Sequence, residues 1–202
     1  MNQSQHRPRL VLAIASICLA AIVGCNGEPL PIGVLPYNFD VLDPDETYRS
    51  SQPTAHQLET IIDRYDIRTV LNLRGENPGD RWYDGEVAVC AARGVTLVDE
   101  PMSARALPPA DVLAGVVGTL QTAEYPILIH CNGGADRTGA VSAIYRMLIL
   151  GEDRSAALAE LSPQHLHFRA YAPCMDTLAD LFEPTPEWLD WYASNVDQIQ
   201  CP

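Results

Sequence analysis

The stretch Pro126-Ile127-Leu128-Ile129-His130-Cys131-Asn132-Gly133-Gly134-Ala135-Asp136-Arg137-Thr138-Gly139 decides the expected fold. Its first part, residues 126–130, is rich in branched apolar side chains and predicts a buried strand. From Arg137 to about Leu150 apolar residues recur at helical spacing, which predicts an amphipathic helix. Gly133 and Gly134 allow the tight backbone turns that must join the two elements. The stretch therefore predicts a strand, a tight loop and a helix.

Residues 131–137, called here the phosphate-binding loop, have the chemistry of an anion site. Backbone N–H groups of such a loop converge on one centre, and the following helix points its positive end at the same place. The same field favours thiolate over thiol at Cys131, which makes its sulfur a nucleophile. Arg137 can offer two N–H groups to two phosphoryl oxygens, and Thr138 can donate its hydroxyl to the sulfur. The residues expected to bind phosphate are Asn132, Gly133, Gly134, Ala135, Asp136 and Arg137.

Strands and helices alternate on both sides of this loop. Further strands are expected at 69–73 and 95–98, and helices at 55–65, 82–93, 110–122, 155–161 and 186–196. Thr54 is a plausible cap for the first helix and Gly94 for the end of the second. Alternation of this kind predicts an α/β fold with a central, mainly parallel sheet flanked by helices on both faces.

The charge of the chain restricts its partners. The formal net charge is −13, from 26 acidic and 13 basic residues. Because proteins bind nucleic acids through a basic face that neutralises phosphates, no nucleic acid is expected as a partner. A small basic pocket for one phosphorylated substrate is compatible with this balance.

The first 24 residues predict export. Met1 to Arg9 is polar with two arginines, Leu10 to Val23 is almost wholly apolar, and Gly24 precedes Cys25. Ile22-Val23-Gly24-Cys25 resembles a bacterial lipobox, which implies a signal peptide over 1–24 and lipidation of Cys25. Residues 25–46 are then the lipidated Cys and a tether. The protein is expected to be a membrane-anchored lipoprotein that faces the periplasm or the cell exterior. An ordinary signal peptide or an uncleaved anchor is the alternative.

The other cysteines fit an oxidising compartment. Cys174 and Cys201 flank the C-terminal segment and are the pair expected to form a disulfide. Cys90 lies within a periodic apolar stretch and is expected to be a buried hydrophobic residue.

The loop sequence matches the Cys-x5-Arg signature of the protein tyrosine phosphatase superfamily. The form His-Cys-x-x-Gly-x-Asp-Arg-Thr-Gly resembles the atypical dual-specificity and inositide-phosphatase branches, and residues 48–53 and 70–74 look like the same branch. The resemblance implies a phosphatase domain over 47–172 that needs no metal or other cofactor, with residues 173–202 as a helical extension packed on it. It also implies that Cys131 is the nucleophile, that Arg137 binds phosphate and that Gly134 is the turn residue. His130 would orient the loop and tune the thiol.

The general acid departs from the family pattern. Many relatives carry an Asp on a loop about thirty residues before the Cys, but here residues 101–107 contain no carboxylate. Asp136, inside the phosphate-binding loop, is our candidate, because its place beside the phosphate is fixed. Its alternative role is to stabilise the loop by pairing with an arginine. Other choices for the acid are Asp99, Glu100 and Asp111, with His165 and His167 in reserve as residues otherwise expected at the surface or in packing.

Several functions remain open at this point. The first is a phosphoric monoester hydrolase acting on a phosphotyrosine protein or an inositol phosphate through a phosphocysteine, with Arg49, Arg74 and Arg105 as possible extensions of the pocket. The second is a catalytically idle module that binds a phosphorylated partner. Sulfur transfer of the rhodanese kind is a third, but its loop lacks the Arg-Thr-Gly entry into a helix.

Overall fold

A five-stranded sheet organises residues 34–202, the part of the chain that this computed structural model describes. The strand order is β1-β2-β5-β3-β4, and every neighbouring pair is parallel except β1 with β2. The strands are β1 Asp40–Asp43, β2 Thr47–Ser50, β3 Thr69–Asn72, β4 Thr96–Asp99 and β5 Ile127–His130. The predicted signal peptide and Cys25 lie outside the described residues.

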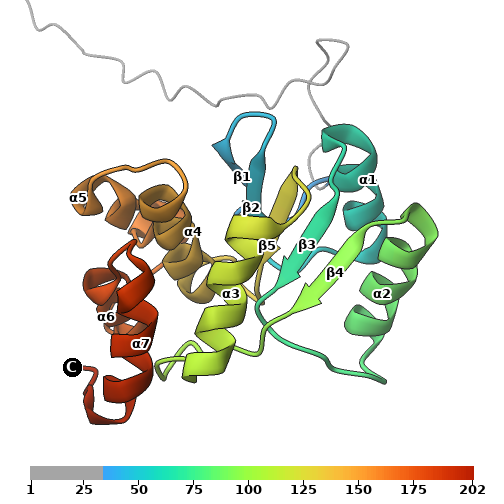
Figure 1. Cartoon of the computed structure of the whole chain (residues 1–202). Helices are drawn as coiled ribbons and strands as arrows, with labels where there is room; N and C mark the ends of the chain where they lie inside the picture. The colour runs from blue at the N-terminus through green and yellow to red at the C-terminus, as the bar shows by residue number, and fades with distance from the viewer. Residues whose placement is uncertain (1–33) are drawn as a thin grey trace, which may run out of the picture. The chain divides into compact units, whose positions relative to one another are not determined.

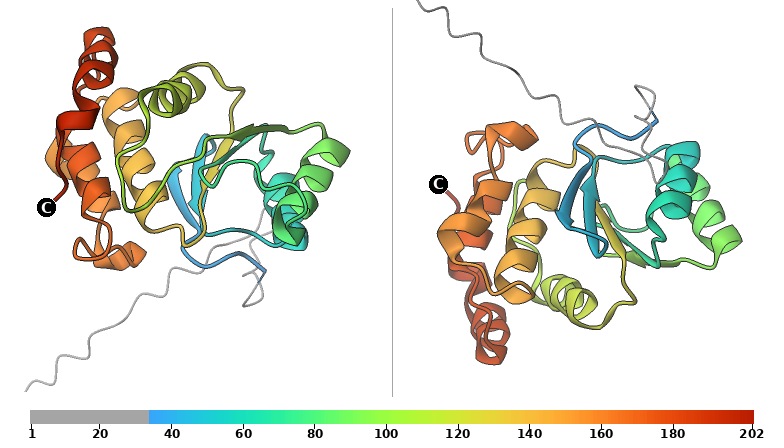
Figure 2. Two further views of the ribbon diagram at one scale, coloured as in Figure 1. Left: turned by 90° about the horizontal axis from the view of Figure 1, so that it is seen from below. Right: turned by 90° about the horizontal axis from the view of Figure 1, so that it is seen from above.

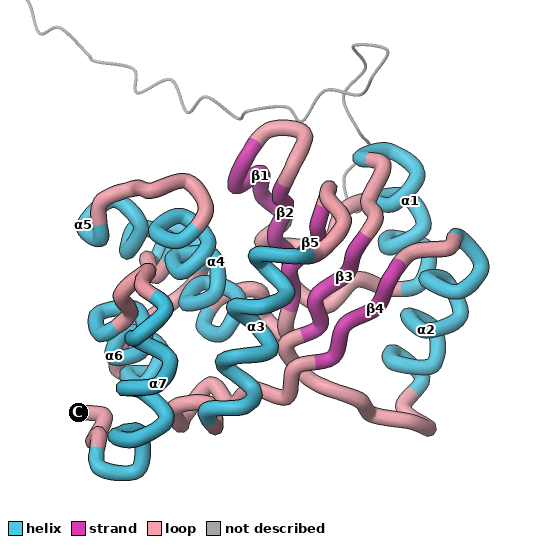
Figure 3. Tube along the Cα trace, viewed as in Figure 1, coloured by secondary structure: helices cyan, strands magenta, loops and turns pink. Residues whose placement is uncertain are grey.

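Strands and helices alternate from β2 to α4 (Figure 3). The helices are α1 Ala55–Tyr65, α2 Arg81–Arg93, α3 Ala110–Thr122, α4 Asp136–Leu148, α5 Arg154–Ala157, α6 Pro173–Leu181 and α7 Pro186–Asn195, with 3-10 turns η1 Leu158–Glu160, η2 Pro163–His165 and η3 Val196–Gln198. The predicted α/β fold with a mainly parallel sheet is confirmed. None of the helices within residues 34–202 is both long and apolar enough to cross a membrane.

Helices cover both faces of the sheet (Figures 1 and 2). Successive residues of a strand point to opposite faces, and the two cores follow this rule. Val70 and Leu128 join the core beneath α1 and α2, whereas Leu71 and Ile129 join the larger core that includes α3, α4, α6 and α7. All four side chains are fully buried, and burying such a side chain contributes about 1.5–3 kcal/mol.

Local signals explain where α1 and α2 begin and end. The hydroxyl of Thr54 accepts a hydrogen bond from the Gln57 N–H, and the Gln57 side chain accepts one from the Thr54 N–H, so the helix starts with a capping box. Gly94 ends α2 in the left-handed conformation at φ +66°. Both caps are the ones that the sequence predicts.

The expected tether over residues 25–46 is wrong for its last part. Asp40–Asp43 form the edge strand β1, which pairs antiparallel with β2 and buries Leu42 in the larger core. The edge of β2 would otherwise present unpaired N–H and C=O groups to solvent, and β1 satisfies them.

The C-terminal segment packs on the outside of the α/β layers. In the figures α6 and α7 lie beyond α4 and α3, away from the sheet (Figures 1 and 2). Cys174, on α6, forms a disulfide with Cys201 across 27 positions of sequence. The predicted pairing is confirmed, and Cys90 is a buried free cysteine as expected.

Candidate active site

Three central strands end in register at the edge of the sheet that carries the phosphate-binding loop. His130 of β5 pairs with Ser50 of β2 on one side and with Asn72 of β3 on the other. The segments that follow these strands therefore meet at one place, which is where parallel α/β sheets bind ligands. The Gln52 N–H donates to the carbonyl of Asn132, and the Leu73 N–H donates to the carbonyl of His130, which ties both segments to the loop.

Cys131 lies at the bottom of the loop. Its sulfur accepts a hydrogen bond from the Gly134 N–H at 3.3 Å, and the residue is buried. The N-terminus of α4 follows directly, so the helix dipole favours negative charge at this point. Thr138, expected to donate to the sulfur, is also buried, but its hydroxyl has no hydrogen-bond partner among the described residues. In this structure the backbone amide of Gly134 is the donor to the sulfur.

Gly134 occupies a position that only glycine fits. Its φ is +65°, and a Cβ atom there would lie 2.5 Å from the Ser51 backbone nitrogen and 2.7 Å from the Ser50 carbonyl oxygen. Both the conformation and the lack of space exclude a side chain. The loop therefore packs directly against the segment that follows β2.

Arg137 is fixed on one side and unpaired on the other. Its Nη1 atom donates to the carbonyl oxygens of Leu73 and Met102, at 3.2 Å each. Its Nε atom is buried without a hydrogen-bond partner in the described part of the chain. Leaving a buried N–H donor unpaired costs free energy. A guanidinium can use Nε together with a second N–H group to bind two oxygens of one anion. The orientation suits a phosphate held on the Nε side of the group.

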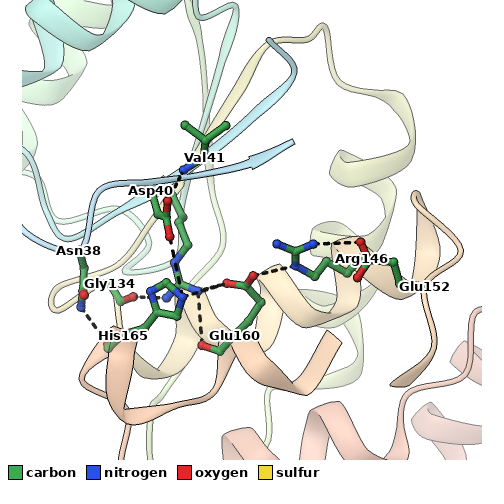
Figure 4. A network of polar contacts seen from close by, with 9 residues as sticks. Asn38, Asp40, Val41, Gly134, Arg146, Glu152, Glu160 and His165 are labelled. Atoms are coloured by element: carbon green, nitrogen blue, oxygen red, sulfur yellow. Dashed lines mark hydrogen bonds and ion pairs between the residues drawn. The ribbon is translucent and has the colours of Figure 1, made fainter. Parts of the chain in front are cut away.

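An ion-pair network supports the loop from below (Figure 4). Arg49 is fully buried, forms an ion pair with Glu160 and donates to the Gly134 carbonyl at 2.5 Å. Glu160 also accepts from Nε of Arg146 at 2.7 Å, and Arg146 reaches Glu152 at 2.9 Å. The idea that Arg49 extends the pocket is wrong, because its charge is neutralised under the loop. It is a structural support for Gly134.

The segment before β1 also holds the loop. The side-chain amide of Asn38 donates to the carbonyl oxygens of Gly133 and His165, at 2.9 Å each. Tyr37, next to it, is largely exposed, and its hydroxyl lies 3.9 Å from where a Cβ of Gly133 would be. Sequence reasoning missed both residues because it assigned this segment to the tether.

His130 has a buried carboxylate behind it. Its Nε2 atom lies 2.7 Å from Oε1 of Glu86, close enough for an ion pair although the atoms are not aligned as a hydrogen bond. The Nδ1 atom faces the Cys131 carbonyl at 3.4 Å. Glu86, on α2, was not foreseen, although a Glu on the buried face of a helix is a signal that could have found it.

The Cys90 thiol, near Glu86, is not suited to act as a nucleophile. Burial, followed by the charge of Glu86, raises its pKa to about 12.

Asp136 pairs with a histidine and not with an arginine. Nδ1 of His167 lies 2.7 Å from Oδ1 of Asp136, and Nε2 of His167 lies 2.9 Å from Oδ2 of Asp176 on α6. Burial lowers the pKa of His167, but the hydrogen bonds to Asp136 and Asp176 outweigh it, so that the net shift is upward. An imidazole between two carboxylates donates from both nitrogens and is positively charged. His167 is buried, so the expectation of a surface position is wrong, and it contacts Asp136 of the phosphate-binding loop.

Two of the other carboxylates considered for the general acid, Asp99 and Glu100, have contacts elsewhere. Asp99 accepts hydrogen bonds from the side chains of Asn72 and Tyr83, at 2.7 Å each. Glu100 packs so closely on α3 that a Cβ at Gly115 would overlap its carboxylate. Burial, followed by the charge of Asp111, raises the pKa of Glu100.

Comparison with known proteins matches residues 42–172 to the family described as a DSP-PTPase phosphatase fused to NAD+ kinase. The dual specificity protein phosphatase TpbA of Pseudomonas aeruginosa is 34% identical over 116 residues, which are 56% of this chain and 49% of TpbA. The core catalytic domain of the PP-IP phosphatase Siw14 from S. cerevisiae, in complex with citrate, has a TM-score of 0.58 at 23% identity and covers 83% of this chain and 97% of its own. TpbA of P. aeruginosa in complex with phosphotyrosine has a TM-score of 0.54 at 23% identity, covering 78% and 96%.

These comparisons have different weights. The two solved structures show the fold, while the chain spans about half the length of TpbA, one of the sequence relatives that it matches. The family match covers residues 42–172, which include the whole phosphate-binding loop and all five strands except the first two residues of β1. This chain therefore belongs to the dual-specificity branch of the cysteine-dependent protein tyrosine phosphatases.

Proposed function

We propose that this protein hydrolyses phosphate monoesters through a phosphocysteine intermediate on Cys131. One observation carries the proposal: the sulfur accepts a hydrogen bond from the loop amide of Gly134, and Nε of Arg137, in the same loop, is buried without a hydrogen-bond partner among the described residues. A nucleophile, backbone donors and a fixed guanidinium are the parts that phosphoryl transfer requires. They lie together at the carboxyl end of β5.

In the first step the thiolate of Cys131 attacks phosphorus, and the bond from phosphorus to the ester oxygen breaks. The loop amides and Arg137 stabilise the charge on the equatorial oxygens as the phosphoryl group passes to sulfur. In the second step water attacks the phosphocysteine, the bond from sulfur to phosphorus breaks, and the thiolate and inorganic phosphate are released. Each step uses only water and groups of this chain.

The leaving oxygen needs a proton, and Asp136 with His167 is the pair proposed to supply it. The proton on Nδ1 of His167 is shared with Oδ1 of Asp136 over 2.7 Å. Its transfer gives a neutral imidazole and a neutral carboxyl group, which is the form that a general acid requires. Asp136 then donates to the ester oxygen and returns to the carboxylate. In the second step it accepts the proton that the attacking water loses, and this proton restores the charged form of His167.

The substrate is a phosphotyrosine protein or an inositol phosphate. The names of TpbA, a dual specificity protein phosphatase, and of Siw14, a PP-IP phosphatase, support these two classes for the relatives. The formal charge of −13 disfavours extended polyanions and leaves small or sparsely charged substrates.

Export and lipid anchoring on Cys25 are part of the proposal. Support comes from the order of charged, apolar and small residues before Cys25 in the sequence. The disulfide between Cys174 and Cys201 is consistent with folding in an oxidising compartment. The protein would face the periplasm or the cell exterior. Cys25→Ala should release it from membranes, and unchanged membrane association with unchanged mass would contradict the anchor.

Turnover of para-nitrophenyl phosphate by the full-length protein tests the catalytic proposal. Cys131→Ser should abolish turnover. It should also abolish the transfer of ³²P label from a phosphorylated substrate to the protein. The matched control is Cys90→Ala, which removes the other free, buried cysteine of residues 34–202 and should retain turnover. Phosphate binding by wild type without turnover would instead support an idle phosphate-binding module.

A further inference from the structure

Arg74 places a second guanidinium at the rim of the phosphate-binding loop. It follows Leu73, whose carbonyl holds Nη1 of Arg137. Its own Nη1 donates to the side chain of Gln52 at 2.9 Å, and the Gln52 backbone donates to the Asn132 carbonyl at 3.1 Å. One chain of contacts thus ties Arg74 to the loop.

The guanidinium of Arg74 is fixed by stacking as well. Its central carbon lies 3.4 Å from the centroid of the Trp82 indole. Stacking on an aromatic face fixes the plane of a guanidinium and leaves its edge donors available. Because Trp82 lies in the first turn of α2 and Gln52 precedes α1, the group is held between two elements and is only partly exposed.

Arg74 has no carboxylate partner, although the protein is rich in acidic residues. Arg49, Arg93 and Arg146 each form ion pairs with one or two carboxylates. Within residues 34–202, Arg74 and Arg137 form none. Burial, followed by the positive charge of Arg137, lowers the pKa of Arg74, although the negative charges of Glu86 and Asp80 act in the opposite direction.

Two adjacent cations that form no ion pair repel each other in the free protein. An anion that bridges them removes the repulsion and pairs both charges. Arg137 binds the scissile phosphate. The N–H donors of Arg74 are then left for a second anionic group close to that phosphate.

We propose that Arg74, held by Trp82 and Gln52, binds a second phosphoryl group of the substrate. The preferred substrate class is then a small molecule with two phosphoryl groups close together, either as a diphosphate or on neighbouring ring atoms. A phosphoryl group matches the guanidinium because it presents two oxygens to a two-donor edge. This inference rests on the proposed phosphatase function, whose site it extends.

Binding of inorganic pyrophosphate and inorganic phosphate to the full-length Cys131→Ser protein tests the inference by calorimetry. Pyrophosphate should bind at least about tenfold more tightly, as one charge-assisted contact of this kind allows. Arg74→Gln and Trp82→Leu should each remove most of this preference, and Arg74→Lys should keep part of it. Arg68→Gln is the matched control, because Arg68 is exposed and paired with Asp66.

Equal affinity for the two anions, or a preference that survives Arg74→Gln in protein with an unchanged melting temperature, overturns the inference. So does an Arg74-dependent preference for phosphotyrosine peptides with an adjacent acidic residue that is absent for pyrophosphate. Because calorimetry uses the serine variant, its result does not depend on turnover. Failure of wild type to hydrolyse any phosphate ester is a separate result that counts against the proposed function.

Discussion

Nδ1 of His167 lies 2.7 Å from Oδ1 of Asp136, although 31 positions of sequence separate the two residues. The contact joins the loop after η2 to the first turn of α4. It brings a positive charge beside the residue that immediately precedes Arg137.

His167→Asn should slow the enzyme most on substrates with poor leaving groups. The variant removes the proton source of Asp136, and general acids contribute about 10²–10⁴-fold to such reactions. We expect kcat for phenyl phosphate to fall at least about tenfold, because its leaving oxygen needs a proton, while a substrate with a better leaving group loses less. His56→Asn is the control, since His56 is an exposed histidine on α1. Equal losses on both substrates would mean that His167 only maintains the structure.

The same histidine makes stability depend on pH. Its pKa is raised in the folded protein above the ordinary value of 6.5, so the folded state holds the proton more tightly than the unfolded chain does. The stabilisation is fully present below pH 6.5 and is lost as the pH rises through the raised pKa. Urea denaturation at a series of pH values should show the free energy of unfolding falling over this range. The fall should be smaller in His167→Asn, and an identical pH dependence in both proteins would contradict the assignment.

Gly134→Ala should disable the site. The added methyl group would lie 2.5 Å from the Ser51 nitrogen, so the loop must shift away from the segment after β2. A displacement of about 1 Å in a catalytic group can cost 10²-fold in rate, and we expect a loss of that size in kcat/KM. The control is Gly151→Ala, which has a similar φ of +66° with open space around it. If both variants keep wild-type turnover, the tight packing of the loop is not required.

Cys201→Ser should lower stability without removing activity. Opening the loop between Cys174 and Cys201 is expected to reduce the free energy of unfolding by about 2–4 kcal/mol. Urea denaturation under non-reducing conditions measures the loss, and reduction with dithiothreitol should reproduce it in wild type and add nothing in the variant. Turnover in the absence of urea should persist, because α6 still buries Met175 and Leu178.

Local signals in the sequence explain how much of the fold could be predicted. Helix α1 is recovered to the residue because Thr54 and Gln57 define its start within one turn of chain. The strand β1 was missed because its four residues, Asp-Val-Leu-Asp, carry one buried side chain and take their conformation from pairing with β2. Strand formation there depends on a partner, and local sequence does not show it.

The same distinction applies to the site. The phosphate-binding loop lies within one contiguous stretch, so its geometry follows from local sequence. The partners that support it come from distant segments: Glu86 from α2, Glu160 from η1, and His167 with Asp176 from the C-terminal third. Acidic and histidine residues are common on surfaces, and only the tertiary fold brings these four into the contacts that support the loop.

Asp176 follows Cys174 by two positions, so the helix that is covalently linked to the C-terminus also supplies the outer partner of His167. The family match ends at residue 172, before this helix begins. A shortened protein that stops there would retain every atom of the loop but would leave the imidazolium with a single carboxylate. We therefore expect the shortest active version of this protein to extend past residue 172.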